Sequence, residues 1–435
     1  MAFDFSVEPE FEKKLEWIRE FVREEVEPLE VLFPSCEFLP LNDERRRIVD
    51  PLKQKVRDQG LWAPHLGPEL GGQGFGAVKL TLINEILGRA TWSSIVFGTQ
   101  APDTGNAEII ARFGTQDQKD TYLAGLLSGE IFSTFSMTEP QGGSDPRVFT
   151  TRAVRDGDDW IINGCKYWSS NASVASFFIV VAITNPDVAV HKGASTFLVP
   201  KDTPGVVVEA THHLVGSHKH DPGHSLVRYD NVRVPASAML GEEGGGFGVA
   251  QSRLAGGRLH HAMRSIGVAQ RAIDMMGRRA KSRFTQGSVL ADKQLIQEFV
   301  ADSYIELAQF RLLVLHAAWL VDTQGEHAAR EAIAACKIQT ANVLKSIGLR
   351  AIQVHGGLGL TDQMPLSSVL FGGIALGLAD GPTEAHKVNL ARMVLKGYEP
   401  EDPVWPSEFM TNRIERAREK YGHLVDRIPA LPVSP

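Results

Sequence analysis

The sequence has few cysteines, no cluster of basic residues and no long apolar segment. Its three cysteines, Cys36, Cys165 and Cys336, are odd in number and far apart, which argues against a disulfide framework and fits a reducing compartment. The formal net charge is -7 and no run of Lys or Arg occurs, so the footprint of a nucleic-acid-binding protein is absent. No apolar run approaches the roughly 20 residues that span a bilayer, and we expect no integral membrane segment.

The N-terminus lacks the marks of a secretion signal. Residues 1–5 carry neither a basic region nor an apolar core, so we expect a cytoplasmic protein. Over 435 residues the chain is 43% hydrophobic and 22% charged. This composition is that of a soluble globular protein with two or three domains.

The hydrophobic pattern changes along the chain and predicts an α+β fold. We expect an N-terminal helical domain over residues 1–130, a small β-barrel or sandwich over 131–242, a C-terminal four-helix bundle over 243–400 and an arm over 401–435. In the first part, apolar residues recur at helical spacing at Phe11, Leu15, Ile18, Val22 and Val26.

Smaller signals place turns and helix ends within these parts. Thr115 with Gln118 predicts a capping box. In the β region, Asp156-Gly157 predicts a hairpin and Asn163-Gly164 a second tight turn. The continuous apolar run from Phe177 to Ile183 suits a strand buried on both faces.

The C-terminal part has helical periodicity over three long stretches. These run over about residues 249–282, 293–323 and 328–354, and a shorter helix follows Pro382. Together these four helices predict an up-and-down bundle.

Three short stretches carry the chemistry. Phe135–Ser144 combines hydroxyls with a Glu-Pro turn and a glycine pair, which allow close approach to a bulky polar ligand and offer amide donors to an anionic group. An ordinary Gly-rich turn is the alternative, because such a motif is weak in isolation. The other two stretches are Lys166–Asn171 and Leu378–His386.

In this order, and with the helical C-terminal third, these stretches resemble the acyl-CoA dehydrogenase family of flavoenzymes. The resemblance runs from about residue 8 to about residue 397. It implies bound FAD, with Thr138 and Ser170 donating to the flavin ring, Ser144 near the pyrophosphate or the CoA, and Trp168 against the flavin. Trp168 as a core residue remains an alternative. The implied flavin contacts also include Phe135, Met137, Gly381, Pro382 and Glu384.

The resemblance also implies flavin sites shared between subunits. Arg283 and the segment Gln353–Gly359, with Gly356 and Gly357, match family contacts that cross a subunit boundary, so we expect a homodimer or homotetramer. The chain departs from the family at Gln286, which replaces an aromatic residue, and at Gly372–Gly377, where relatives carry arginines.

The catalytic base has two positions in this family. One is Asp380, in an Asp-Gly-Pro branch of the family, and the other precedes Arg258, where Gly257 cannot act as a base. Arg258 is expected beside the substrate thioester. Two alternatives stay open, namely that Asp380 caps the final helix or that Glu384 is the base.

The implied reaction is FAD-dependent α,β-dehydrogenation of an acyl-CoA thioester to the trans-2-enoyl-CoA, as in fatty acid β-oxidation. Electrons would pass to an electron-transfer flavoprotein. An oxygen-using flavoenzyme of the same fold, an oxidase or a monooxygenase, is one alternative, and a helical scaffold without chemistry is another. Residue spacing does not reveal the length or branching of the acyl chain.

A cluster of histidines raises the question of a metal. The five residues match no standard zinc spacing, so no metal site is predicted and we expect a polar loop near the flavin or the acyl-CoA entrance. They are His212, His213, His218, His220 and His224.

Overall fold

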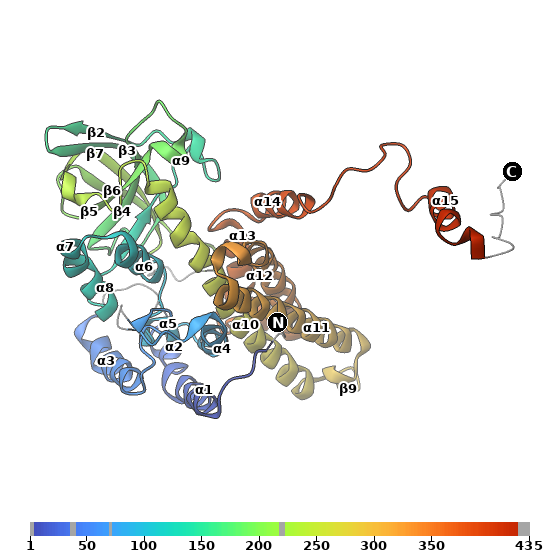
Figure 1. Ribbon diagram of the computed structural model, residues 1–435. Coiled ribbons are helices and arrows are strands. Elements are labelled where there is room, and N and C mark those ends of the chain that lie inside the picture. The colour runs from blue at the N-terminus through green and yellow to red at the C-terminus, as the bar shows by residue number, and fades with distance from the viewer. Residues whose placement is uncertain (1–3, 35–40, 69–71, 217–221, 425–435) are drawn as a thin grey trace. The chain divides into compact units, whose positions relative to one another are not determined.

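The computed structural model describes residues 4–34, 41–68, 72–216 and 222–424. Its contacts form two compact units, Met1–Val388 and Asn389–Pro435, which we describe separately. Figure 1 shows the first unit as a group of N-terminal helices, a β-sheet and a bundle of long helices.

The N-terminal helices pack in two apolar cores, one formed by the helices up to residue 97 and the other by residues 107–126 against the sheet. Phe11, Leu15 and Ile18 are buried in the first, as the helical spacing predicted. The predicted capping box is present, since the Thr115 hydroxyl accepts from the Gln118 N–H and the Gln118 side chain accepts from the Thr115 N–H. The helices are α1 (Pro9–Phe21), the π-helical turn η1 (Val22–Val26), α2 (Leu29–Leu32), α3 (Asp43–Asp58), α4 (Gly76–Leu87), α5 (Ser93–Val96), α6 (Asp103–Phe113), α7 (Gln116–Gln118), η3 (Lys119–Leu123) and α8 (Ala124–Ser128).

In the described residues, seven strands form the main sheet. They follow the order β1-β4-β2-β3-β7-β6, with β5 paired to β4. The pair β1–β4 is parallel, whereas β3–β7 and β4–β5 are antiparallel. The strands are β1 (Ser133–Ser136), β2 (Arg152–Asp156), β3 (Asp159–Ser170), β4 (Phe177–Ile183), β5 (Ala194–Pro200), β6 (Val206–His212) and β7 (His224–Pro235). The apolar run in β4 is buried as predicted.

One turn prediction in this region was wrong. Asp156-Gly157 does lie in the β2–β3 hairpin, but Asn163-Gly164 lies inside β3. The register of β3 against β7 shifts between Ile162 and Gly164, so the segment is a bulge. A Cβ on Gly164 would lie 2.4 Å from the Thr151 Oγ1 atom. The long pairing of β3 with β7 therefore overrides the local turn signal.

The bundle contains the three long helices predicted, but its fourth helix is not the one after Pro382. The long helices are α10 (Gly246–Ser282), α11 (Gln294–Gln324) and α12 (Glu326–His355). The fourth is α13 (Leu366–Leu378), whose Leu366 and Val369 enter the bundle core. Its glycines disfavour a helix by propensity, which hid it in the sequence. A Cβ on Gly373 would lie 2.9 Å from the Leu344 Cβ, so this glycine allows α13 to approach α12 closely.

Helix α10 connects the sheet with the bundle. It has 37 residues and spans about 55 Å. A Cβ on Gly246, at its start, would lie 2.5 Å from the backbone of Ser195 in β5. At its other end comes the hairpin of β8 (Phe284–Thr285) and β9 (Ser288–Val289), which Figure 1 shows at the far end of the bundle from the sheet.

Helix α11 is long and apolar enough to cross a membrane by length and composition. Its residues Leu307, Phe310 and Val314 are buried in the bundle core. A core helix of a bundle passes the same test of length and composition, so α11 is weak evidence for a membrane span.

The second unit begins within α14 (Thr383–Leu395). Its start, Asn389, precedes the predicted beginning of the arm at residue 401. The described part contains the basic helix α15 (Met410–Tyr421) and a stacked pair of exposed rings, Trp405 and Phe409, with centroids 4.6 Å apart.

Candidate active site

Two of the three sequence motifs meet where the segment after β1 contacts β3. The Tyr167 N–H donates to the Thr138 carbonyl at 2.9 Å, which joins the segment after β1 to β3. Below this bond, the Ser136 and Ser169 hydroxyls lie 2.8 Å apart, and the Tyr229 hydroxyl donates to Ser136. We call this part, Phe135–Thr138 with Lys166–Asn171, the sheet half of the site.

A buried ion pair fixes the sheet half. The Lys166 Nζ donates to the Glu139 carboxylate at 2.9 Å and to the Met137 carbonyl at 2.7 Å, and both charged side chains are fully buried. Glu139 also accepts from the N–H groups of Thr150 and Thr151. Burial alone would raise the pKa of Glu139, but Lys166 and these donors lower it to about 2. Burial lowers the pKa of Lys166 to about 8 despite the attraction of Glu139. Both groups are therefore charged at neutral pH.

Trp168, on β3, presents an aromatic surface beside this contact. The residue is 48% exposed with φ +64°, so it is not a core residue. Its ring stacks on Tyr167 at 4.4 Å and meets His224 edge-on at 5.8 Å. The next hydroxyl, on Ser170, lies 2.8 Å from the His224 Nδ1. The following Asn171 has a buried Nδ2 without a partner among the described residues.

An exposed indole beside hydroxyl and amide groups fits a planar ring system with polar edges, as a flavin has. Ser144 is exposed in the turn before the short helix Pro146–Val148.

Arg253, which sequence reasoning missed, connects the sheet to α10. Its guanidinium lies 4.4 Å from the Phe135 ring centroid, and its Nε donates to the Asn106 Oδ1 at 2.6 Å. Nearby, Asp103 accepts from the Ser133 N–H and hydroxyl, and burial raises the pKa of Asp103 to about 7. An arginine on a helix face that otherwise carries glycine, Gly256 and Gly257, was the available signal.

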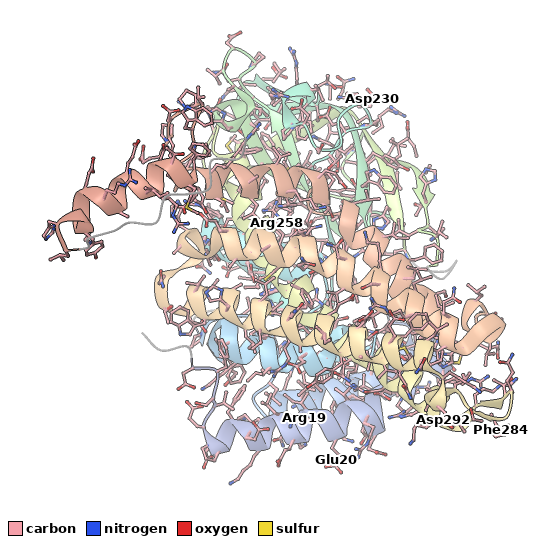
Figure 2. All side chains as sticks on the ribbon, turned by 90° about the vertical axis from the view of Figure 1, so that its right-hand side faces the viewer. Arg19, Glu20, Asp230, Arg258, Phe284 and Asp292 are labelled. Atoms are coloured by element: carbon pink, nitrogen blue, oxygen red, sulfur yellow. The ribbon has the colours of Figure 1, made fainter. Side chains whose placement is uncertain are left out.

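Asp380 follows α13 in a left-handed backbone conformation, with φ +52°. Its carbonyl accepts from the Arg258 Nε at 3.1 Å and lies 3.1 Å from the His386 Nε2. Gly381 has φ +94°, and a Cβ there would lie 2.9 Å from the same His386 nitrogen. The Gly-Pro step thus allows the chain to bring Asp380 to α10. Arg258, labelled near the middle of the view in Figure 2, is half-buried.

The Asp380 side chain is 23% exposed and faces α10. A Cβ on Gly257 would lie 3.9 Å from the Asp380 Oδ2, and the His261 Nε2 lies 3.8 Å from the same oxygen. The hydrogen bonds at Asp380 involve its carbonyl, and in the described residues its carboxylate takes no N–H of α14. This arrangement does not support the capping alternative. Glu384 is exposed on the first turn of α14. We call Arg253, Gly257, Arg258, His261 and Asp380 the helix half of the site.

A cavity of about 610 Å³ lies against the neighbouring face of α10. Gly256 lines it, and a Cβ there would lie 3.2 Å from the Glu108 Oε2. Burial raises the pKa of Glu108 to about 7 and lowers that of His65, which also lines the cavity, to about 3. Consecutive glycines on α10 therefore face Glu108 and Asp380.

The residues expected to cross a subunit boundary lie away from this site. Arg283 is exposed at the end of α10, thirty residues after Arg253, which corresponds to about 45 Å along the helix. Figure 2 shows the adjoining Phe284 at the end of the bundle. Gln353, Gly356 and Gly357 are exposed at the end of α12.

The described residues include two of the three cysteines and three of the five clustered histidines. Cys165 and Cys336 are free thiols, and Cys36 lies outside the described residues. His218 and His220 also lie outside them, whereas His212 contacts the Tyr167 ring edge-on at 5.7 Å.

The fold and the site together define a flavoenzyme-type oxidoreductase with helical, sheet and helical domains. Family models for the N-terminal, middle and C-terminal domains of acyl-CoA dehydrogenase match residues 8–130, 134–232 and 244–395. The chain belongs to the acyl-CoA dehydrogenase family and is an acyl-CoA dehydrogenase in class. The three-domain α+β prediction is confirmed.

Relatives agree with this assignment. A probable acyl-CoA dehydrogenase, FadE2, of Mycobacterium tuberculosis is 41% identical over 356 residues, covering 80% of this chain and 86% of that protein. Acyl-CoA dehydrogenase family member 11 of Rattus norvegicus is 39% identical, over 80% of this chain but 45% of its own length. A solved structure of a putative acyl-CoA dehydrogenase from Mycobacterium abscessus has a TM-score of 0.84 and 37% identity, covering 91% of this chain and 100% of that one.

Proposed function

We propose that this enzyme converts an acyl-CoA thioester to the trans-2-enoyl-CoA, with Asp380 as the base that removes the Cα proton. The observation that carries the proposal is the Asp380 carboxylate, which faces glycine on α10 while its backbone carbonyl is bonded to Arg258 and His386. A base must reach the proton that it abstracts, and a partly exposed carboxylate beside a residue without a side chain has that room.

The cofactor is FAD, which when bound accepts the hydride that leaves Cβ. Solved neighbours of similar fold support this, among them a glutaryl-CoA dehydrogenase from Mycobacterium smegmatis in complex with FADH2, with 26% identity and a TM-score of 0.75. In this chain, the residues that would hold the ring are Phe135, Met137, Thr138, Trp168 and Ser170 of the sheet half.

The protein's part in the reaction is positioning and proton removal. The Cα–H bond breaks and an O–H bond forms on the Asp380 carboxyl. Arg258 and His386 hold the Asp380 carbonyl, so the backbone that carries the base is fixed on two sides. Gly257 leaves space for the substrate between α10 and the base.

We infer further that the enzyme is a homo-oligomer whose copies share flavin sites. Because Arg283 is about 45 Å along α10 from Arg253, it cannot reach the sheet half of its own chain. An exposed arginine at that distance is available to a second copy. Electrons would leave to an electron-transfer flavoprotein; a similar fold in the electron-transferring flavoprotein of Acidaminococcus fermentans, at 26% identity, is consistent with such a partner.

The test is anaerobic flavin bleaching by a panel of butyryl-, octanoyl- and palmitoyl-CoA. Asp380→Asn keeps the shape of the side chain and removes the base, so we expect FAD and acyl-CoA binding without bleaching. Glu384→Gln tests the alternative base and, because Glu384 is also an expected flavin contact, it is compared at equal FAD content, where it should bleach as the wild type does. Normal bleaching by Asp380→Asn, or loss of bleaching in Glu384→Gln, would reject Asp380 as the base. Hydrogen peroxide release during turnover would instead indicate an oxidase.

A further inference from the structure

His261 lies beside the carboxylate of Asp380 on the same face of α10 as Gly257. Gly257 and His261 are four positions apart on α10, and Arg264 follows His261 by three positions. All three therefore lie along one side of the helix. The His261 Nε2 is 3.8 Å from the Asp380 Oδ2, and the His261 side chain is 28% exposed. In the described residues, no other Lys, Arg or His nitrogen lies within 4.0 Å of this carboxylate.

The contact with Arg264 sets the proton on the His261 ring. The Arg264 Nη2 lies 3.3 Å from the His261 Nδ1. A guanidinium can only donate, so Nδ1 accepts, and a neutral imidazole then carries its proton on Nε2. Burial and the charge of Arg264 lower the pKa of His261 to about 4, so the ring is neutral at physiological pH. A neutral N–H group therefore points toward Asp380.

We propose that His261 is a positioning residue for the base, donating its Nε2–H to the Asp380 Oδ2 and leaving Oδ1 to take the Cα proton. The inference rests on the proposed function of Asp380. The present separation is longer than a hydrogen bond, and the proposal requires it to shorten by somewhat less than 1 Å in the substrate complex. Catalytic hydrogen bonds that are long in a ligand-free active site often tighten only in that complex.

The proton balance explains why a neutral donor suits this place. The Cα–H bond breaks, the new O–H bond forms at Oδ1, and Oδ2 remains an acceptor throughout. His261 therefore neither gains nor loses a proton. A charged imidazolium would favour the ionised carboxylate and oppose its protonation. Burial and the adjacent charge of Arg264 prevent this by keeping His261 neutral.

The other charged groups near Asp380 are engaged elsewhere. Arg258 and His386 bond to its carbonyl, and Arg253 donates to Asn106. Lys337, on α12, donates to the Leu376 carbonyl, and burial lowers the pKa of Lys337 to about 8 although Asp380 attracts it. On α14, Glu384 is exposed. Arg253 and Arg258 still attract the carboxylate through their charges, but of the described cationic and imidazole nitrogens only that of His261 lies within 4.0 Å of it.

The test compares His261→Leu with His261→Gln, each as the FAD-loaded protein. Both are mixed anaerobically with octanoyl-CoA, and the rate of flavin bleaching is followed from acid to alkaline pH. For His261→Leu we expect a rate at saturating octanoyl-CoA lower by roughly tenfold or more, the range for a hydrogen bond to a charged group. The acid limb of the profile should move to higher pH by about one unit, because a donor to the ionised form is lost. His261→Gln, which retains an N–H donor, should recover most of both effects.

Arg264→Met is the second variant, used if His261→Leu does not fold. It keeps the histidine and removes the cation that helps to keep it neutral, so the bleaching rate should fall while the acid limb moves to lower pH, because an imidazolium favours the ionised carboxylate. Nearby carboxyls such as Asp103 and Glu108 are present in the wild type and in each variant. A difference between the pH profiles of these proteins therefore does not come from them.

The inference is overturned if His261→Leu keeps the wild-type rate and pH profile, or if His261→Leu and His261→Gln are equally impaired. Asp380→Asn distinguishes a failure of the positioning role of His261 from a failure of Asp380 as the base. If Asp380→Asn is inactive and His261→Leu is normal, His261 has no positioning role but the proposed function stands. If Asp380→Asn bleaches normally, the proposed function itself fails.

Discussion

The sheet half and the helix half of the site are held by different means. In the sheet half, a fully buried ion pair, Lys166–Glu139, and main-chain bonds fix the residues expected at the flavin. In the helix half, glycines allow close approach, and Arg258 and His386 hold one backbone carbonyl. The comparison teaches that the sheet half is held in place by a buried ion pair. The helix half depends instead on how closely its helices approach one another.

Removing the cation of the buried pair should break the sheet half. Lys166→Met leaves Glu139 charged and unpaired. We expect the free energy of unfolding to fall by about 3–5 kcal/mol and the variant to lose its bound FAD. Urea unfolding and released-flavin assays measure these effects. Arg228→Met, which breaks an exposed ion pair with Glu209 on the same sheet, is the control and should change little. Equal losses in both variants would contradict the distinction between buried and exposed pairs.

The cavity beside the helix half should show a pH dependence caused by Glu108, which lines it from α6. The folded-state pKa of Glu108 is about 7, above the ordinary 4.5, so the stability that it contributes is present at low pH and is lost as pH rises from about 4.5 through 7. Glu108→Gln removes this loss and should stabilise the protein at pH 8 by up to about 3 kcal/mol relative to the wild type. Little difference is expected at pH 4.

Urea unfolding at the two pH values measures this difference. Glu331→Gln, an exposed residue of α12, is the control. A Glu108→Gln protein that is no more stable at pH 8 than the wild type would show that Glu108 is accommodated as a charged group.

Two neighbouring glycines of α13 test the role of close helix approach. A Cβ on Gly373 would lie 2.9 Å from the Leu344 Cβ, and we expect Gly373→Ala to destabilise the protein by about 1–3 kcal/mol. A Cβ on Gly372 meets nothing within 4 Å, so Gly372→Ala should stabilise it by up to about 1 kcal/mol through helix propensity. Thermal unfolding distinguishes the two, and the same sign in both variants would contradict the packing argument.

The smallest expected effect on stability is that of Trp168. Because the residue is 48% exposed, Trp168→Ala should leave the melting temperature nearly unchanged. Its FAD dissociation constant should rise about tenfold through lost ring stacking. Titration of the apoprotein with FAD measures this, with Trp405→Ala, an exposed residue of the second unit, as the control. Unchanged FAD affinity in Trp168→Ala would remove Trp168 from the cofactor site.

The sequence indicated those parts of the site that are continuous in the chain. Phe135–Ser144 and Lys166–Asn171 were visible as motifs, and a single main-chain bond from the Tyr167 N–H to the Thr138 carbonyl joins them, although β1 and β3 are not neighbours in the sheet. Two local signals misled the prediction. Asn163-Gly164 suggested a turn but forms a bulge, and the glycines of Gly372–Gly377 concealed α13.

By itself, the sequence determined the order of helical and β regions, the helix spacing of Phe11–Val26 and the carboxylate at position 380. Periodicity is a local property, so it can be read along the chain. The tertiary structure decided that Arg253 lies against Phe135, that α13 completes the bundle and that His261 faces Asp380. These contacts join residues more than a hundred positions apart, except within the bundle, and they depend on how closely helices and strands approach. The separation between two packed elements is set by the side chains of both, so it cannot be predicted from either stretch of sequence alone.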